Sequence, residues 1–236
     1  MAFHVDEFGT LYPLGVKVIR NSRFELLPTT RDYFEEIPGR DGEFDFGCDF
    51  ESRIIELQCF IKISPSEWFE KEREIAGYLN PKLGVQELTF ADAPNKVFKV
   101  RYAGKLDYVE EGPGYRKFVI PFKMTDPYIY SATESVLNGT GTALNKGNVP
   151  TPCIIEIKGS VTNPVVQING VELKYTGLVT ASDTLIIDTD KKTVTFNGVN
   201  ALANYNGVFP KLGVGVNYIV KASTGTTTIK WRDRWI

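Results

Sequence analysis

Short segments in which apolar and polar residues alternate recur along the chain and predict a mainly β protein. They are rich in Val, Ile, Thr, Tyr and Phe and are bounded by Gly, Pro, Asn and Asp, as strands joined by turns are. In the first half they read GVKVIR, RIIELQCFIKI, VQELTF, KVFKVRYAGKLDYV and YRKFVIPFKM. In the second half PVVQI and VELKY are separated only by Asn169-Gly170, which favours the type I′ turn of a hairpin. TLIID and TVTFNG flank a further predicted hairpin.

One segment has helical periodicity instead. Ser64 can cap a helix that begins with Pro65, and Glu67 completes a capping box. Five apolar residues then share one face: Trp68, Phe69, Ile75, Ala76 and Leu79. Because Asn80-Pro81 ends the run, the pattern predicts one amphipathic helix of about four turns whose apolar face belongs to the core.

The composition changes near residue 130. Residues 131–152 are rich in Gly, Thr, Ser and Asn and show little periodicity, which is typical of a linker. We therefore predict two domains, residues 1–130 and residues 131–236, with the linker within 131–152. The first is predicted as a β-sandwich with one α-helix and a β-hairpin, and the second as a compact β-sandwich or jelly roll.

Charge and composition exclude several classes of function. The 236 residues carry a net charge of −2 with no polybasic run, so we expect no binding to nucleic acid. No apolar stretch approaches the roughly 20 residues of a membrane-spanning helix, and the first residues carry acids where a signal peptide needs bases. The chain is therefore expected to fold in cytosol.

Cys48, Cys59 and Cys153 are irregularly spaced and are expected to be buried small hydrophobes.

Candidate catalytic chemistry is sparse. His4 is the only histidine, and no nucleophile elbow, phosphate-binding loop or zinc-ligand spacing is present. We therefore predict no enzyme, no metal and no cofactor. A glycosidase needs only two carboxylates at a suitable separation, and the 29 acidic residues leave that alternative open.

The stretch IPGRDGEFDFGCDF, residues 37–50, resembles a metal loop at first sight. It fails as a calcium-binding EF-hand, because Phe46 stands where the turn needs glycine and Ser52 where the loop needs glutamate. We interpret EFDFGCDF as a strand with Phe44, Phe46 and Cys48 inward. Arg40 and Asp41 are then exposed at a turn rich in glycine, where they form either a contact with another surface or a solvated turn.

The tail TIKWRDRWI admits two interpretations. Trp231 and Trp235 have the same parity, so in a continuous strand both point to one face, with Arg232 and Arg234 on the other. The pair could stack on sugar rings, or it could complete the core of a sandwich. The alternation of Trp and Ile favours the core.

The order of these features resembles the distal tail protein family (Dit) of long-tailed bacteriophages and related phage-derived particles. RDYFEEIPGRDGEFDFG, the helix SPSEWFEKEREIAGYLN and the run RYAGKLDYVEEGPGYRKFVIPFKMTDPYIY resemble successive parts of the family's N-terminal domain. PCIIEIKGSVTNPVVQINGVELKY, LIIDTDKKTV and FPKLGVGVN resemble its galectin-like C-terminal domain. The resemblance spans nearly the whole chain and depends on order and spacing.

The resemblance implies a structural hub at the distal end of a phage tail. N-terminal domains would form a homo-hexameric ring that joins the tail tube to the tail tip or baseplate and the host-adsorption apparatus. The implied partners are the tail tube protein, a tail-associated fibre or lysin protein and receptor-binding proteins, in a virion assembled in the host bacterial cytoplasm. Arg40 and Asp41 are the candidate residues of the ring interface. The alternative is a carbohydrate-binding module that recognises cell-wall sugars through the galectin-like domain.

Overall fold

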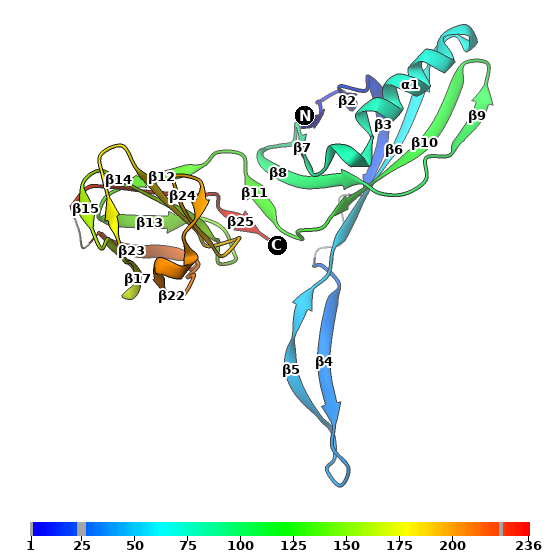
Figure 1. Cartoon of the computed structure of the whole chain (residues 1–236). Coiled ribbons are helices and arrows are strands. Elements are labelled where there is room, and N and C mark those ends of the chain that lie inside the picture. The colour runs from blue at the N-terminus through cyan, green and yellow to red at the C-terminus, as the bar shows by residue number, and fades with distance from the viewer. Residues whose placement is uncertain (1, 23–26, 222–223) are drawn as a thin grey trace. The chain divides into compact units, whose positions relative to one another are not determined.

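The computed structural model describes residues 2–22, 27–221 and 224–236 (Figure 1). Contacts between Cα atoms divide the chain into two units, one that runs to Ile129 and includes Ile236, and one that spans Tyr130–Trp235. Strands dominate both, and α1 (Trp68–Tyr78) is the single α-helix of the described residues. The predicted mainly β fold is confirmed. No described helix has both the length and the apolar character needed to span a membrane.

The first unit is built on one large sheet that closes on itself. Within this unit its order is β8-β7-β1-β2-β3-β6-β10-β9, and β8 also pairs with β10 through Phe122↔Tyr102 and Lys123↔Arg101. The strands are β1 (Ala2–Val5), β2 (Thr10–Tyr12), β3 (Val16–Ser22), β6 (Arg53–Lys62), β7 (Gln86–Phe90), β8 (Ala93–Tyr102), β9 (Tyr108–Gly112) and β10 (Tyr115–Met124).

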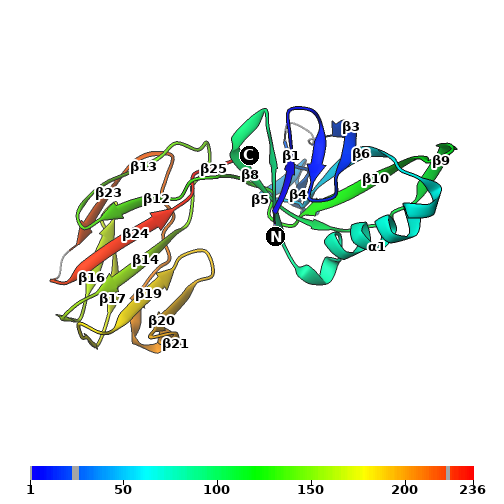
Figure 2. The ribbon, with the colours of Figure 1, turned by 90° about the horizontal axis from the view of Figure 1, so that it is seen from above.

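Alternation along β6 and β10 places the core of this unit. In β6, Ile55 and Leu57 are fully buried while their neighbours are exposed, and β10 buries Ile120 and Phe122 in the same way. Helix α1 lies alongside β10 and β9 (Figure 2). Inward side chains of strands and helix thus form one continuous core.

The helix differs from its prediction at both its start and its apolar face. It begins with a 3₁₀ turn, Pro65–Glu67, and the Ser64 side chain caps no backbone N–H but contacts the Ser66 hydroxyl at 2.8 Å. Three predicted positions are buried, Trp68, Ile75 and Leu79. Phe69 and Ala76 are exposed, because the buried residues follow the i, i+7, i+11 spacing of one narrow stripe and each of these two residues lies about 100° round the helix from it.

A separate hairpin belongs to the first unit. Strands β4 (Thr30–Glu36) and β5 (Glu43–Phe50) pair only with each other, as a two-stranded sheet. A further short strand, β11 (Ile129–Ser131), lies where the chain passes from the first unit to the second.

The second unit is a β-sandwich. One sheet has the order β12-β24-β14-β19-β20-β21, whose first four strands lie side by side in Figure 2, and the other has the order β13-β23-β16-β17-β22. The first sheet contains β12 (Ser135–Asn138), β24 (Thr226–Trp231), β14 (Cys153–Lys158), β19 (Thr184–Asp188), β20 (Thr193–Phe196) and β21 (Val199–Asn200). The second contains β13 (Gly141–Asn145), β23 (Gly215–Lys221), β16 (Val165–Ile168), β17 (Val171–Tyr175) and β22 (Tyr205–Gly207). Shorter strands are β15 (Val161–Thr162), β18 (Leu178–Val179) and β25 (Arg234–Trp235).

The segment predicted as a linker is largely folded into this sandwich. Residues 131–152 include β12 and β13, and Ala143 and Asn145 are buried. The Asn145 side chain donates to the carbonyl oxygens of Val149 and Leu212, at 2.9 and 3.3 Å. The polar composition that suggested a linker therefore reflects an edge strand and buried hydrogen bonds.

Two local predictions in the second unit are confirmed. Asn169 and Gly170 both have positive φ, 52° and 82°, as the type I′ turn between β16 and β17 requires. Trp231 is a core residue, 7% exposed, with its indole N–H donating to Asp233 at 3.1 Å. The tail is not one continuous strand, since β24 ends at Trp231 and β25 begins at Arg234, and Arg234 is buried rather than outward.

Candidate assembly interface

The β4–β5 hairpin is the most exposed element of the described chain. Every side chain from Thr30 to Phe50 is exposed, aromatic ones included, whereas the other long strands alternate buried and exposed positions. A two-stranded hairpin is marginally stable in water by itself. Uncovered aromatic side chains on such an element indicate a surface that another molecule covers.

A β-bulge gives the hairpin two different faces. The register runs Asp32↔Cys48 and then Phe34↔Asp45, so β5 contains one extra residue, near Gly47 with φ 89°. Residues opposite one another share a face, and Glu35 opposes Phe44. Phe44 therefore lies on the face of Glu35, and Cys48 on the opposite face with Asp32.

The face that contains Glu35 is aromatic. The rings of Phe44 and Phe46 lie 6.4 Å apart, and the Tyr33 hydroxyl donates to Asp49 Oδ2 at 3.0 Å. Phe46 is 66% exposed. These three rings, which we call the aromatic face, form a preorganised apolar surface with carboxylates beside it.

The hairpin is also strongly acidic. Residues 30–50 contain seven carboxylates and two arginines, a formal charge of −5, whereas the whole chain carries −2. The remainder of the chain therefore carries a formal charge of +3. An acidic, aromatic element favours a partner surface that is apolar and basic.

The two residues predicted for the ring interface lie at the tip of this hairpin. The Arg40 guanidinium carbon lies 3.7 Å from the centre of the Phe44 ring, and the Arg40 amide donates to the carbonyl oxygen of Ile37. Asp41 is exposed beside Gly42, whose φ is 80°. Arg40 thus holds the tip against the aromatic face, at about 0.5–1 kcal/mol for an exposed cation–π contact.

The predicted inward face of this stretch is wrong, and so is the predicted burial of Cys48. The strand forms at Glu43–Phe50 as predicted, but Phe44, Phe46 and Cys48 are exposed rather than inward. The hairpin packs on no sheet, so it has no inner side, and the bulge separates Cys48 from the two rings. The acid–aromatic alternation in TRDYFEE, which lacks an apolar face, was the available signal that this hairpin stands outside the core.

A second apolar feature of the first unit is a hollow of about 400 Å³ beside α1. It is lined by Trp68, Leu79, Tyr102 and Tyr108 among others. Arg116 lies against the rings of Trp68 and Tyr108, at 3.9 and 4.5 Å from their centres, and 3.6 Å from a carboxylate oxygen of Glu72. Glu72 is the carboxylate among the lining residues, and it is engaged by Arg116 and by the indole N–H of Trp68. This packing secures β9 to the helix.

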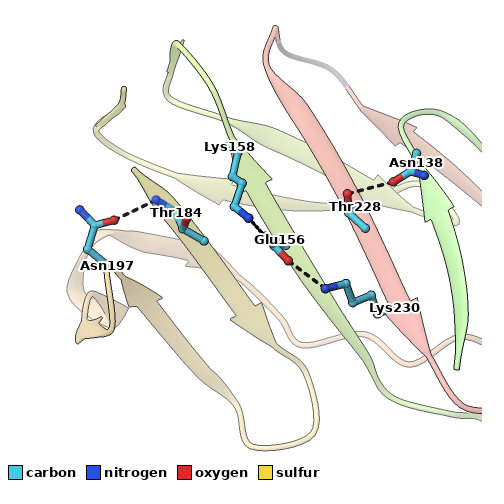
Figure 3. A network of polar contacts seen from close by, with 7 residues as sticks. All are labelled: Asn138, Glu156, Lys158, Thr184, Asn197, Thr228 and Lys230. Carbon is cyan, nitrogen blue, oxygen red and sulfur yellow. Dashed lines mark hydrogen bonds and ion pairs between the residues drawn. The ribbon is translucent and has the colours of Figure 1, made fainter. Parts of the chain in front are cut away.

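The second unit carries a polar network on the outer face of its six-stranded sheet (Figure 3). Glu156 on β14 pairs with Lys158 and, at 3.0 Å, with Lys230 on β24. Hydrogen bonds from both lysines hold the pKa of Glu156 below its ordinary value. To either side, Thr228 donates to Asn138 at 3.0 Å and the Thr184 amide donates to Asn197 at 2.9 Å.

This polar face is the place where a sugar-binding function would be sought. Its charged groups satisfy one another, and no aromatic side chain of the described strands points outward there to stack on a sugar ring. Trp231, the residue considered for stacking, faces the core. We interpret this face as a solvated sheet surface, because no feature of its described residues favours carbohydrate binding.

The residues considered for catalysis remain apart. His4 is exposed, with Nδ1 2.9 Å from the Thr89 hydroxyl. Within the described ranges no three His, Cys, Asp or Glu side chains are grouped to hold a metal ion. Cys59 and Cys153 are buried as predicted, and burial raises the pKa of each thiol to about 12.

Comparison with known proteins identifies the class of this fold. Residues 10–124 match the phage tail protein RIFT-related domain, and residues 146–235 match the C-terminal domain of siphovirus-type tail components. No curated protein sequence matches the chain.

A solved structure shares the fold of this chain. The crystal structure of the Dit protein (gp 19.1) of phage SPP1, described as a paradigm of the hub adsorption apparatus of phages that infect Gram-positive bacteria, superposes with a TM-score of 0.76 at 14% identity over 94% of each chain. The baseplate of phage P2 in its activated conformation with calcium gives a TM-score of 0.43 at 10% identity, over 92% of this chain and 90% of that one.

The two matched domains cover most of the chain in the order of a phage tail component. The protein belongs to the siphovirus distal tail (Dit) family. The resemblance seen in the sequence is thereby confirmed, and the chain is a phage tail protein of the virion.

Proposed function

We propose that this protein is a structural hub at the distal end of the tail, and that its first unit forms a homo-hexameric ring. The ring joins the tail tube protein on one side to the tail tip or baseplate and the host-adsorption apparatus on the other. A tail-associated fibre or lysin protein and receptor-binding proteins are the further partners. The virion to which it belongs is assembled in the host bacterial cytoplasm, and the protein is not an enzyme.

The exposed hairpin is the observation that carries this proposal. It places five exposed aromatic side chains, three of them on the aromatic face, and a formal charge of −5 on an element that pairs with no other strand. A closed ring requires each subunit to offer such a surface to a neighbour through a heterologous contact. Family membership supports the tail location of the ring.

Electron microscopy of the purified chain mixed with the tail tube protein tests the proposal. We expect six-fold rings, some seated on the ends of tube segments, because hub and tube share an axis in the proposed arrangement. Rings of another symmetry, or dispersed monomers in the presence of the tube protein, would show that the hub assignment is wrong.

Arg40 and Asp41 are proposed to belong to the ring interface. Arg40→Glu removes the guanidinium from the Phe44 ring and adds a like charge to an acidic tip, so ring formation should weaken while the thermal midpoint of the monomer stays nearly constant. The matched control is Arg73→Glu on α1, where the guanidinium carbon lies 4.6 Å from the centre of the Phe69 ring. Equal effects of the two variants would remove Arg40 from the interface.

A further inference from the structure

A ring contact between identical chains joins two different surfaces of the same subunit. The hairpin supplies one of them. Two hairpins are poor partners for each other, because each carries a formal charge of −5. The complementary surface should therefore lie elsewhere on the chain and should be apolar and basic.

The outer face of the large sheet meets this description. A hollow of about 330 Å³ lies over β3, β6, β9 and β10. Ile19, Val109 and Val119 line it and are exposed, on the side of the sheet opposite the core. A volume near the lower end of the small-molecule range suits one aromatic side chain.

Lysines surround this hollow. Lys105 and Lys117 line it, and each pairs with an exposed neighbour, Asp107 at 2.9 Å and Glu111 at 2.6 Å. The same side carries five lysines and three carboxylates, namely Lys17, Lys62, Lys105, Lys117 and Lys123 against Glu56, Asp107 and Glu111. Exposed ion pairs contribute little to stability, so these lysines can turn to a partner's carboxylate at small cost.

The hairpin offers the matching groups on one face. Glu35 lies directly opposite Phe44, so a carboxylate stands beside the aromatic face. A ring inserted into the hollow would bring this carboxylate near the lysines that surround it.

We propose that the aromatic face of one subunit's hairpin packs into the hollow lined by Ile19, Val109 and Val119 of the next subunit, with Glu35 against Lys117. The proposal rests on the proposed ring and names the two surfaces that close it. The occupant of the hollow is a second copy of this chain.

Charge exchange tests the contact. Glu35→Lys and Lys117→Glu each place like charges across every interface, so each variant alone should weaken ring formation at least about tenfold in protein concentration. The double variant restores opposite charges at every interface and should assemble within about threefold of the wild type. Native mass spectrometry over a dilution series measures both effects.

Mixing the two single variants gives a sharper result. Each variant carries like charges on its hairpin and its hollow, so it repels copies of itself but complements the other variant. A ring of six can alternate the two variants without a mismatch, because six is even. An equimolar mixture should therefore form rings in which the variants alternate, with three copies of each. A mass tag on one variant distinguishes these rings from random mixtures.

Lys174→Glu is the matched control. The side chain of Lys174 is 50% exposed and that of Lys117 is 49% exposed, and Lys174 also pairs with an exposed carboxylate, that of Glu172, at 2.5 Å. It should leave ring formation unchanged. If the wild type forms no ring, the proposed function fails. If the wild type forms rings and the single variants assemble like the control, or the double variant and the mixture both fail to restore rings, the named contact is wrong while the hub proposal stands.

Discussion

Phe46→Ala separates assembly from folding more cleanly than any other single change in the hairpin. Phe46 lies on the aromatic face and is 66% exposed. Its side chain contacts Phe44 but belongs to neither core cluster. The fold of the subunit should therefore tolerate the substitution, whereas an interface that covers the ring should not.

The size of the effect follows from the exposed area. An aromatic side chain presents about 200 Å², so about 130 Å² of Phe46 remains for a partner to cover. At about 25 cal/mol per Å² its burial contributes about 3 kcal/mol to each subunit contact. That free energy corresponds to roughly a hundredfold weaker contact in the variant.

Mass photometry over a dilution series measures the loss of rings, and a thermal melt of the monomer measures folding. Tyr218→Ala is the control, because Tyr218 is 65% exposed but lies on β23 of the second unit, outside the proposed ring. We expect both variants to melt close to the wild type and only Phe46→Ala to shift assembly to about a hundredfold higher concentration.

Two results would refute this reasoning. Equal shifts in assembly for Phe46→Ala and Tyr218→Ala would show that the second unit carries the contact as much as the hairpin. An unchanged assembly curve for Phe46→Ala, with the control also unchanged, would show that the aromatic face stays in solvent.

Three further predictions concern the second unit. Trp231→Ala should lower the free energy of unfolding by about 3–5 kcal/mol in urea denaturation, because the indole is a buried core group, and a loss under about 1 kcal/mol would contradict its place there. Glu156→Gln should lower the free energy of unfolding at pH 7 but match the wild type well below pH 4. A carboxylate with a lowered pKa contributes stability that is lost as the pH falls through its pKa in the folded protein. If the difference in stability between variant and wild type stays constant from pH 7 to pH 3, the network does not contribute as described. Residues 130–236 expressed alone should melt cooperatively. Residues 147–236 should be markedly less stable, because that fragment lacks β12 and β13. Equal thermal stability of the two fragments would show that those strands are dispensable.

Much of the fold could be predicted, because in many strands the local pattern of apolar and polar residues agrees with the tertiary packing. In β6 the alternation of Leu57 and Cys59 with the polar residues Glu56 and Gln58 is the burial pattern itself. Asn169-Gly170 specifies its turn through backbone conformation alone. Such positions need no knowledge of distant contacts.

The errors have a common cause, which is that burial depends on partners that local sequence does not name. EFDFGCDF alternates like a half-buried strand, yet no sheet lies beneath it, so Phe46 and Cys48 are exposed. Residues 131–152 look like a linker because they contain buried polar groups such as Asn145, whose side chain donates to a backbone carbonyl 67 residues away. In the candidate interface, the sequence correctly predicted that Arg40 and Asp41 are exposed at a turn. The hollow near Lys117 could not be predicted, because its lining residues come from four strands and a loop and form no continuous pattern in the sequence.

The mass of the full-length protein in solution tests the central claim most directly. The chain has a mass of 26.4 kDa. Sedimentation equilibrium at micromolar concentration should give about 158 kDa for a closed ring of six subunits, or a heavier complex that contains six copies of the chain once the tail tube protein is added. A mass of 26.4 kDa under both conditions would contradict the hexameric hub.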